Sequence, residues 1–175
     1  NELGASEYYK ILAKNIHPAQ KDTPQEGNNA IGNNVPKVDL EKNIKIYRAS
    51  EKAIQKELVS SAISVNSGGL GIALAKACVG GILGCEVSLY PIGKTDGVEG
   101  KLFSESQGRI LVSISPANVS EFEKIIKNIF YAKLGKVAKD GKIIIKDRTE
   151  VIETNVKKLS KIYHKFSDSV NNTHI

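Results

Sequence analysis

The sequence predicts a layered fold in which helices pack on a mixed, mainly antiparallel β-sheet, on the border of the α+β and α/β classes. Segments with an apolar period of 3.6 alternate along the chain with short apolar runs of strand type. Turn residues and capping side chains separate these segments. With 175 residues the chain is long enough to bury a core of its own. We expect one domain over 1–166, with a flexible loop over 17–36, and a disordered polar tail over 167–175.

In the N-terminal half, a helix is expected from a Ser6 cap to Ile16, and Asp39 is expected to cap a second, long helix. A short strand over 60–65 and a turn over 66–69 lead into a third helix, which Gly80 and Gly81 end. The positions expected to face inward on these helices are Tyr8, Leu12 and Ile16, then Leu40, Ile44, Tyr47, Ile54 and Leu58, then Leu70, Ala73, Leu74, Ala77 and Cys78.

In the C-terminal half, strands are expected over 85–89 and 109–114. Asn118 with Glu121 resembles a capping box, which predicts a helix that continues to Ile129. Residues 131–137 and 142–146 suit a hairpin across the turn Lys139-Asp140-Gly141. Thr154 is expected to cap a last helix, whose apolar positions are Val156, Leu159, Ile162, Tyr163 and Phe166.

Composition narrows the functional class. A hydrophobic content of 41% and a charged content of 25% are ordinary for a globular protein. No apolar run approaches the ~20 residues of a membrane span, and no signal-peptide pattern opens the chain, so we expect a cytoplasmic protein without a membrane partner. The net charge is +6, but the 25 basic residues are scattered and all but three are Lys, so no nucleic-acid partner is expected. Cys78 and Cys85 lack the spacing of a zinc site and are expected to be buried thiols.

Two polar turns carry the candidate binding chemistry. The octet 102–109, LFSESQGR, stands directly before a strand and brings Glu105, Ser106, Gln107 and Arg109 together. The Gly68-Gly69 turn opens a helix, where free backbone N–H groups and the helix dipole favour an anion. Each turn also has a plain structural explanation, namely a polar connection and close packing of a helix on a strand.

The two turns share an edge of the sheet only if their strands are antiparallel, because one turn follows a strand and the other precedes one. We therefore predict antiparallel pairing of 61–65 with 109–114. The donors would then be the Gly68 and Gly69 amides, the Ser106 hydroxyl and the Gln107 amide, with Arg109 as a charge partner. A phosphate, sulfate or nucleotide phosphate would suit this pocket.

Four motifs resemble one enzyme family. They are ELGASEYY at 2–9, VPKVDL at 35–40, GGL at 68–70 followed by Ala73-Leu74-Ala75, and LFSESQGR at 102–109. In this order they are similar to the C-terminal domain in the second half of the small-type large subunit of phosphoribosylformylglycinamidine synthase, within the aminoimidazole-ribonucleotide-synthase-like superfamily. The resemblance implies a layered domain that is partly like a ferredoxin fold. Because the chain begins inside a motif and contains no Met, we expect a piece of a longer polypeptide.

The resemblance also implies an activity for the whole enzyme. That ligase converts formylglycinamide ribonucleotide, ATP and glutamine to formylglycinamidine ribonucleotide, ADP, phosphate and glutamate, with Mg²⁺ as cofactor. The resemblance places the catalytic residues in other domains, so we expect no catalytic residue here, and Glu105 to Gln107 would line an auxiliary nucleotide site. The implied partners are the remaining domains, a glutaminase subunit and a small bridging subunit.

One motif departs from the family, which leaves alternatives open. Many members have HDVSDGGL where this chain has ISVNSGGL, so Ile63, Ser64 and Ser67 replace the His and both acidic residues. Charge pairing and Mg²⁺ support at those positions are therefore in doubt. The alternatives are another ATP-dependent enzyme of the superfamily, such as a thiamine-monophosphate-kinase-like or hydrogenase-maturation-like protein, and a free-standing, non-catalytic dimerisation or regulatory module.

Overall fold

The structure, a computed structural model, describes residues 3–16, 36–93 and 97–171. The predicted loop 17–36 lies outside these residues except for its last position. The chain divides into two compact units, one of Asn1–Ala73 with Lys94–Tyr131 and one of Leu74–Gly93 with Ala132–Ile175. The predicted domain 1–166 contains parts of both units, and its behaviour as a single domain stays a prediction.

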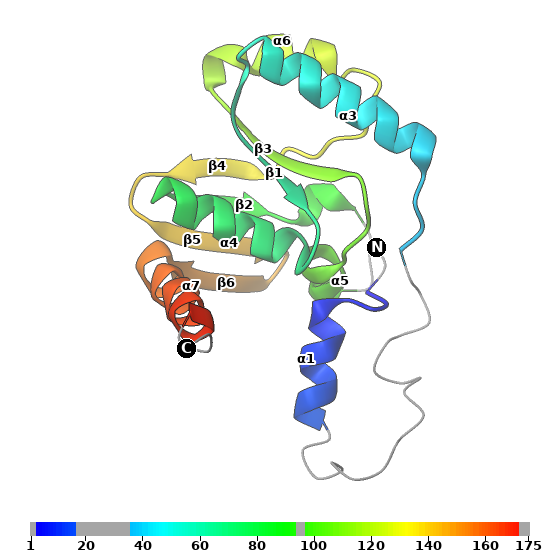
Figure 1. The fold of residues 1–175 in the computed structure, drawn as a ribbon. Coiled ribbons are helices and arrows are strands. Elements are labelled where there is room, and N and C mark those ends of the chain that lie inside the picture. The colour runs from blue at the N-terminus through cyan, green and yellow to red at the C-terminus, as the bar shows by residue number, and fades with distance from the viewer. Residues whose placement is uncertain (1–2, 17–35, 94–96, 172–175) are drawn as a thin grey trace. The chain divides into compact units, whose positions relative to one another are not determined.

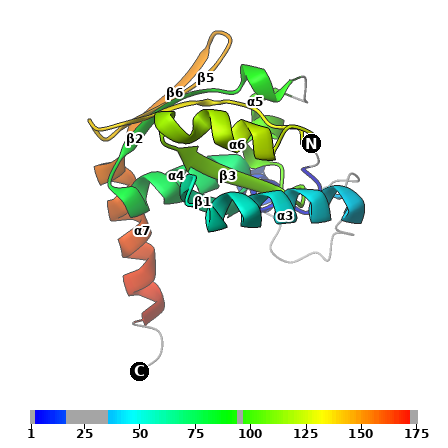
Figure 2. The ribbon, with the colours of Figure 1, turned by 90° about the horizontal axis from the view of Figure 1, so that it is seen from above.

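The first unit holds a two-stranded antiparallel ribbon and several helices (Figure 1). The ribbon pairs β1 (Val59–Val65) with β3 (Arg109–Ile114), and its register runs from Val59 opposite Ile114 to Val65 opposite Arg109. The helices are α1 (Glu7–Ile16), α3 (Leu40–Gln55), the start of α4 (Gly69–Gly81), α5 (Gly97–Phe103) and α6 (Val119–Ile125), with the short 3-10 helix η2 (Pro116–Asn118) before α6. Helices α3 and α6 lie side by side (Figures 1 and 2).

The second unit is built on a four-stranded mixed sheet in the order β4-β2-β5-β6. The strands are β2 (Gly84–Ser88), β4 (Gly135–Ala138), β5 (Lys142–Asp147) and β6 (Glu150–Asn155). The remaining part of α4 and helix α7 (Val156–Asn171) lie on the same face of this sheet in both views, and η1 (Tyr90–Ile92) follows β2 (Figures 1 and 2). Of the four strand pairs among the described residues, only β2 with β5 is parallel. The predicted class, helices on a mixed, mainly antiparallel sheet, is confirmed.

The predicted hairpin of 131–137 with 142–146 is wrong. Strands β4 and β5 both pair with β2, on its opposite sides, and the hairpin of this region joins β5 to β6. Two glycines help to explain the order. A Cβ on Gly135 would lie 2.9 Å from the Cα of Val87, and a Cβ on Gly84 would lie 2.7 Å from the backbone nitrogen of Lys142. Each glycine lets a neighbouring strand approach β2 closely.

The predicted inward face of α3 is also wrong. Asp39 caps the helix as predicted, since its side chain accepts the Lys42 N–H at 3.0 Å. However, Leu40 is 69% exposed and Tyr47 is 50% exposed, whereas the buried residues of α3 are Asn43 and Ala53. Leu58 is buried, but it lies beyond the helix.

The end of α3 explains the burial of Leu58. The N–H of Leu58 bonds the carbonyl of Ala53 at 3.1 Å, and Glu57 takes a positive φ of 56°. These features form a Schellman motif, which turns the residue after the left-handed position back onto the last turn of the helix.

Other predicted boundaries need smaller corrections. Asn118 does not cap α6 through its side chain; its amide instead donates to the carbonyls of Glu57 and Leu58, both at 3.4 Å. Helix α6 ends at Ile125, not at Ile129. Asn155, not Thr154, caps α7 by accepting the Lys158 N–H at 2.9 Å. Helix α7 continues through 167–171 of the predicted tail, and the rest of that tail lies outside the described residues.

Candidate functional site

The two polar turns meet at one edge of the ribbon, as predicted. Strands β1 and β3 are antiparallel, and Val65 at the end of β1 pairs with Arg109 at the start of β3. The Gly68-Gly69 turn and the segment 104–108 therefore leave the ribbon at the same end. Residues Leu102 and Phe103, predicted as part of the second turn, instead form the last residues of α5.

Gly69 marks the closest approach of the two segments. It has a φ of +66°, and a Cβ there would lie 2.5 Å from the Leu102 carbonyl oxygen and 2.7 Å from that of Ser104. Only glycine tolerates both this backbone conformation and this contact. The N–H of Gly69 bonds the Asn66 carbonyl at 2.8 Å. Gly69 therefore allows α4 to pack closely against the end of α5. Of the two explanations that the sequence left open for this turn, close packing is the one that Gly69 supports.

The carboxylate of Glu105 occupies the Gly68 amide, one of the donors that the sequence assigned to a ligand. Its Oε1 accepts the Gly68 N–H at 2.8 Å and the Glu7 N–H at 2.9 Å. Gly68 directly precedes α4, and Glu7 is the first residue of α1. A carboxylate thus lies at the N-terminal ends of two helices, where the exposed N–H groups and the helix dipoles stabilise negative charge. In this structure the anion at the α4 N-terminus is supplied by the chain itself.

Arg109 holds the shape of the second turn. Its guanidinium donates to the carbonyl of Ser106 at 3.1 Å and also to the carbonyl of Ser104. Burial lowers the pKa of Arg109 from its usual value, yet a guanidinium stays charged at any physiological pH. Gln107 is exposed, and its amide donates to the Glu105 carbonyl at 3.4 Å. Arg109 therefore stabilises backbone carbonyls here and does not pair with the Glu105 carboxylate.

Residues that the sequence reasoning missed complete the site. Gly108 has a φ of +77°, and a Cβ there would collide with the Asn43 side chain of α3. The ring of Tyr8 stacks on that of Phe103, with centroids 4.9 Å apart and planes 3° from parallel. Ser104 is fully buried, and its hydroxyl has no hydrogen-bond partner among the described residues. Nothing in the sequence marked Asn43, because the sequence does not show which face of α3 is buried.

The residues that replace the family's acidic motif lie on or beside β1. Ile63 and Ser64 belong to the strand, and Ser67 is exposed in the turn that follows. Within the described residues no group of three or more His, Cys, Asp or Glu side chains gathers to hold a metal ion. Mg²⁺ prefers carboxylate oxygens, and this stretch offers hydroxyls and an isoleucine in their place. The residues present do not fit a Mg²⁺ site.

Comparison with known proteins identifies the domain. The family described as "AIR synthase related protein, C-terminal domain" matches residues 1–148. The chain belongs to this family. Among curated proteins it is similar to phosphoribosylformylglycinamidine synthase subunit PurL of Methanocaldococcus jannaschii, with 34% identity over 94% of the chain, and to PurL of Thermococcus sibiricus, with 31% identity over 93% of the chain. The chain spans about a fifth of the length of these relatives.

Solved structures support the fold. PurL of Thermotoga maritima, complexed with FGAR, matches with a TM-score of 0.65 and 21% identity, over 78% of this chain and 23% of that chain. The hydrogenase maturation protein HypE matches with a TM-score of 0.52 and 13% identity, over 62% of this chain and 40% of that chain. The AIR-synthase-like fold is therefore shown. Within the described residues no helix is long and apolar enough to cross a membrane.

Proposed function

We propose that this chain is the C-terminal domain of a phosphoribosylformylglycinamidine synthase and that it is not catalytic alone. The observation that carries the proposal is the similarity to PurL subunits at 31–34% identity over almost the whole chain. The whole enzyme would convert formylglycinamide ribonucleotide, ATP and glutamine to the amidine, ADP, phosphate and glutamate. This domain would act in the assembly of the enzyme, with a glutaminase subunit and a small bridging subunit as further partners, in the cytoplasm.

The site supports a role without acid–base or nucleophilic chemistry. Its side chains are a carboxylate bonded to two amides, a guanidinium bonded to two carbonyls, and a buried serine hydroxyl. None of these arrangements pairs a nucleophile with a base, which is what covalent or general-base catalysis requires. We expect the chain to unfold cooperatively and to show no ATP hydrolysis and no amidine synthesis on its own.

Reconstitution tests this assignment. The chain would be mixed with the remaining polypeptide of its parent synthase, supplied separately, together with ATP, formylglycinamide ribonucleotide and ammonia. Amidine synthesis that needs both components is the expected result. Turnover by the chain alone would contradict the proposal, and so would turnover by the remaining polypeptide that does not change when the chain is added.

A second part of the proposal concerns a nucleotide. We propose that the edge formed by Gly68, Gly69 and 105–109 contacts a nucleotide phosphate once Glu105 releases its two amides. A phosphate and the Glu105 carboxylate need the same N–H donors, so they exclude one another. Gly68 and Glu7 would supply the released amides, Gly69, Ser106, Gln107 and Arg109 are the residues that we expect to line the vacated position, and Glu105 would control access to it.

Amide chemical shifts distinguish the two occupants. In a Glu105→Ala variant, titration with ADP or inorganic phosphate should shift the amide resonances of Gly68 and Glu7, whereas the unaltered chain should show little change. A Gln107→Ala variant, which keeps the carboxylate, serves as the matched control and should behave like the unaltered chain. Unchanged Gly68 and Glu7 resonances in Glu105→Ala would refute the phosphate role and leave the synthase assignment untouched.

A further inference from the structure

Helix α3 carries an apolar stripe that the rest of the described chain does not cover. Leu40, Ile44, Tyr47 and Ile54 lie on one face of α3, and the exposed Glu51 stands on the same face between Tyr47 and Ile54. Ile44 is 48% exposed and Ile54 is 52% exposed, and the other two are exposed at least as much as Ile44. Apolar residues scattered singly over a surface need no explanation, whereas four large apolar side chains on one face of a helix, with one carboxylate among them, indicate a contact surface.

The stripe runs into a groove on the same unit. The groove has a volume of about 210 Å³ and lies between α3, α6 and the ribbon. Its lining is mostly apolar and includes Ser50, Ile54, Val59, Ala62, Ile63, Ser64, Ile110, Val112 and Phe122. Ile54 belongs both to the stripe and to the groove, so the two form one surface. We call the stripe and groove together the α3 surface.

The ribbon beside the groove lacks further strands. Within the described residues β1 and β3 pair only with each other, and most of β1 is exposed. A two-stranded ribbon is marginally stable by itself and leaves strand edges that another chain can use. The ribbon therefore adds unpaired backbone groups to the same exposed region.

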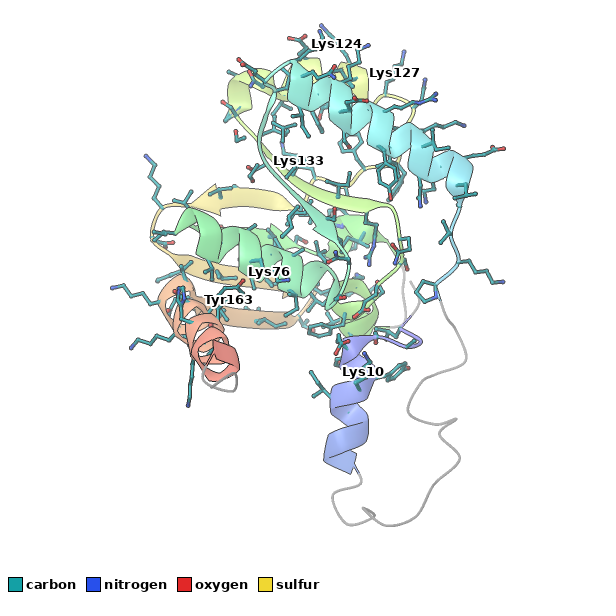
Figure 3. The ribbon with its side chains drawn as sticks, in the orientation of Figure 1. Lys10, Lys76, Lys124, Lys127, Lys133 and Tyr163 are labelled. Carbon is teal, nitrogen blue, oxygen red and sulfur yellow. The ribbon has the colours of Figure 1, made fainter. Side chains whose placement is uncertain are left out.

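Charge along α3 indicates what kind of partner would fit. The side of the stripe away from the groove carries the exposed cations Lys45, Arg48 and Lys52. Two carboxylates oppose them, Glu41 on that side and Glu51 within the stripe. Lys124 and Lys127 add cations at the end of the neighbouring helix α6 (Figure 3). A partner with an apolar strip and carboxylates along one flank would be complementary to this surface.

We propose that the α3 surface docks another domain of the synthase-length polypeptide, one that presents an apolar strip flanked by carboxylates. The chain spans about a fifth of the length of its PurL relatives, so most of such a polypeptide would lie outside these residues. The proposal rests on the proposed synthase function and adds to it the surface that makes the contact. It also explains why the large apolar side chains of the stripe are exposed, whereas Asn43 and Ala53 are buried.

Two charge substitutions on the α3 surface test the proposal. Ile44→Asp and Ile54→Asp place a carboxylate in the stripe at half-exposed positions, so each variant should fold normally. Ile162→Asp on α7 is the matched control, because Ile162 is also a helical isoleucine and is 59% exposed. Binding to the remaining synthase polypeptide would be measured by titration calorimetry, with circular dichroism as the check on folding. Each stripe variant should weaken binding at least about tenfold, and the control should bind like the unaltered chain.

Hydrogen exchange on the unaltered chain provides a measurement that does not depend on the folding of any variant. Addition of the remaining synthase polypeptide should slow exchange in α3 and along β1, and leave α7 unchanged. Equal binding by all three variants, or protection that spares α3, would overturn the docking proposal even if amidine synthesis is reconstituted. Self-association of the unaltered chain that Ile44→Asp abolishes would overturn it too, in favour of a second copy. Binding through α3 without amidine synthesis would instead contradict the synthase assignment and support the docking surface.

Discussion

The carboxylate of Glu105 accepts the backbone N–H of Gly68 at 2.8 Å, across 37 residues of sequence. The same oxygen accepts the N–H of Glu7, so one side chain joins the N-terminal ends of α1 and α4 to the segment before β3. A chain without this carboxylate would leave both amides to water or to another anion. The stability of this edge therefore depends on Glu105, and so does the phosphate access that we propose for it.

Removal of the Glu105 carboxylate should destabilise the first unit. A hydrogen bond to a charged group contributes roughly 1.5–3 kcal/mol, and the half-buried position of Glu105 argues for the lower end. We expect Glu105→Gln to lower the free energy of unfolding by about 1 kcal/mol and Glu105→Ala by about 2 kcal/mol, measured by urea denaturation. The exposed neighbour Gln107 offers a control, since Gln107→Ala should change stability by less than about 0.5 kcal/mol. Equal stability of Glu105→Ala and the unaltered chain would refute this role.

Gly69 should tolerate no side chain. In Gly69→Ala the new methyl group would meet two backbone carbonyl oxygens, and the backbone would keep a φ of +66°. Backbone atoms cannot rotate away as a side chain does, so we expect a loss of about 3 kcal/mol or more. Gly80, in the same helix, has open space around its Cβ position. Gly80→Ala should therefore stabilise the chain by about 0.5–1 kcal/mol. Equal melting temperatures of the two variants would contradict the special role of Gly69.

Ile82 occupies a position that suits glycine. Helix α4 ends in a Schellman motif, in which the Leu83 N–H bonds the Cys78 carbonyl and Ile82 takes a φ of 53°. A β-branched residue in the left-handed region costs about 1–2 kcal/mol, and the Ile82 side chain is 78% exposed, so it recovers little by packing. Glycine removes this strain, but it also gives the unfolded chain more conformational entropy, which offsets part of the gain. The net effect of Ile82→Gly should be an increase of about 0.5–1 kcal/mol in the free energy of unfolding. Ile82→Ala keeps the strain and should show no gain.

Local signals predicted much of the fold. The Asp39 cap, the glycines around α4 and the strand-type runs each act within a few residues, and the structure confirms the elements that they predict. The hairpin failed because strand order depends on contacts distant in sequence, here the approach of Gly84 and Gly135 to the neighbours of β2. The sequence did not predict helix α5, because the helix has only seven residues and two of them are glycines. The burial of Leu102, and not helix propensity, stabilises it.

The candidate site was predictable in place but not in detail. Antiparallel pairing of β1 with β3 was enough to bring the two turns together. The sequence could not show that Glu105 would take the Gly68 amide, because a carboxylate of the chain and a bound phosphate satisfy the same donors. Nor could it show the orientation of α3, because its apolar stripe has the same helical period whether it faces the core or a partner.

The acid stability of the second unit should depend on Glu86. This carboxylate bonds Lys146 at 2.8 Å and lies 3.3 Å from Lys136, and these hydrogen bonds hold its pKa below the usual 4.5. Because the folded pKa is depressed, the ion pairs contribute stability above the unfolded pKa and lose it as pH falls through the folded value. The melting temperature of Glu86→Gln should therefore lie below that of the unaltered chain at about pH 7, and the difference should close as pH falls below about 4.5. Added salt of about 1 M should shrink the same difference at neutral pH, because the pairs are exposed. In acid the Glu86 side chain is protonated, so it is as uncharged as the glutamine of the variant. A melting-temperature difference that persists there would show that the packing of Glu86, and not its charge, is responsible.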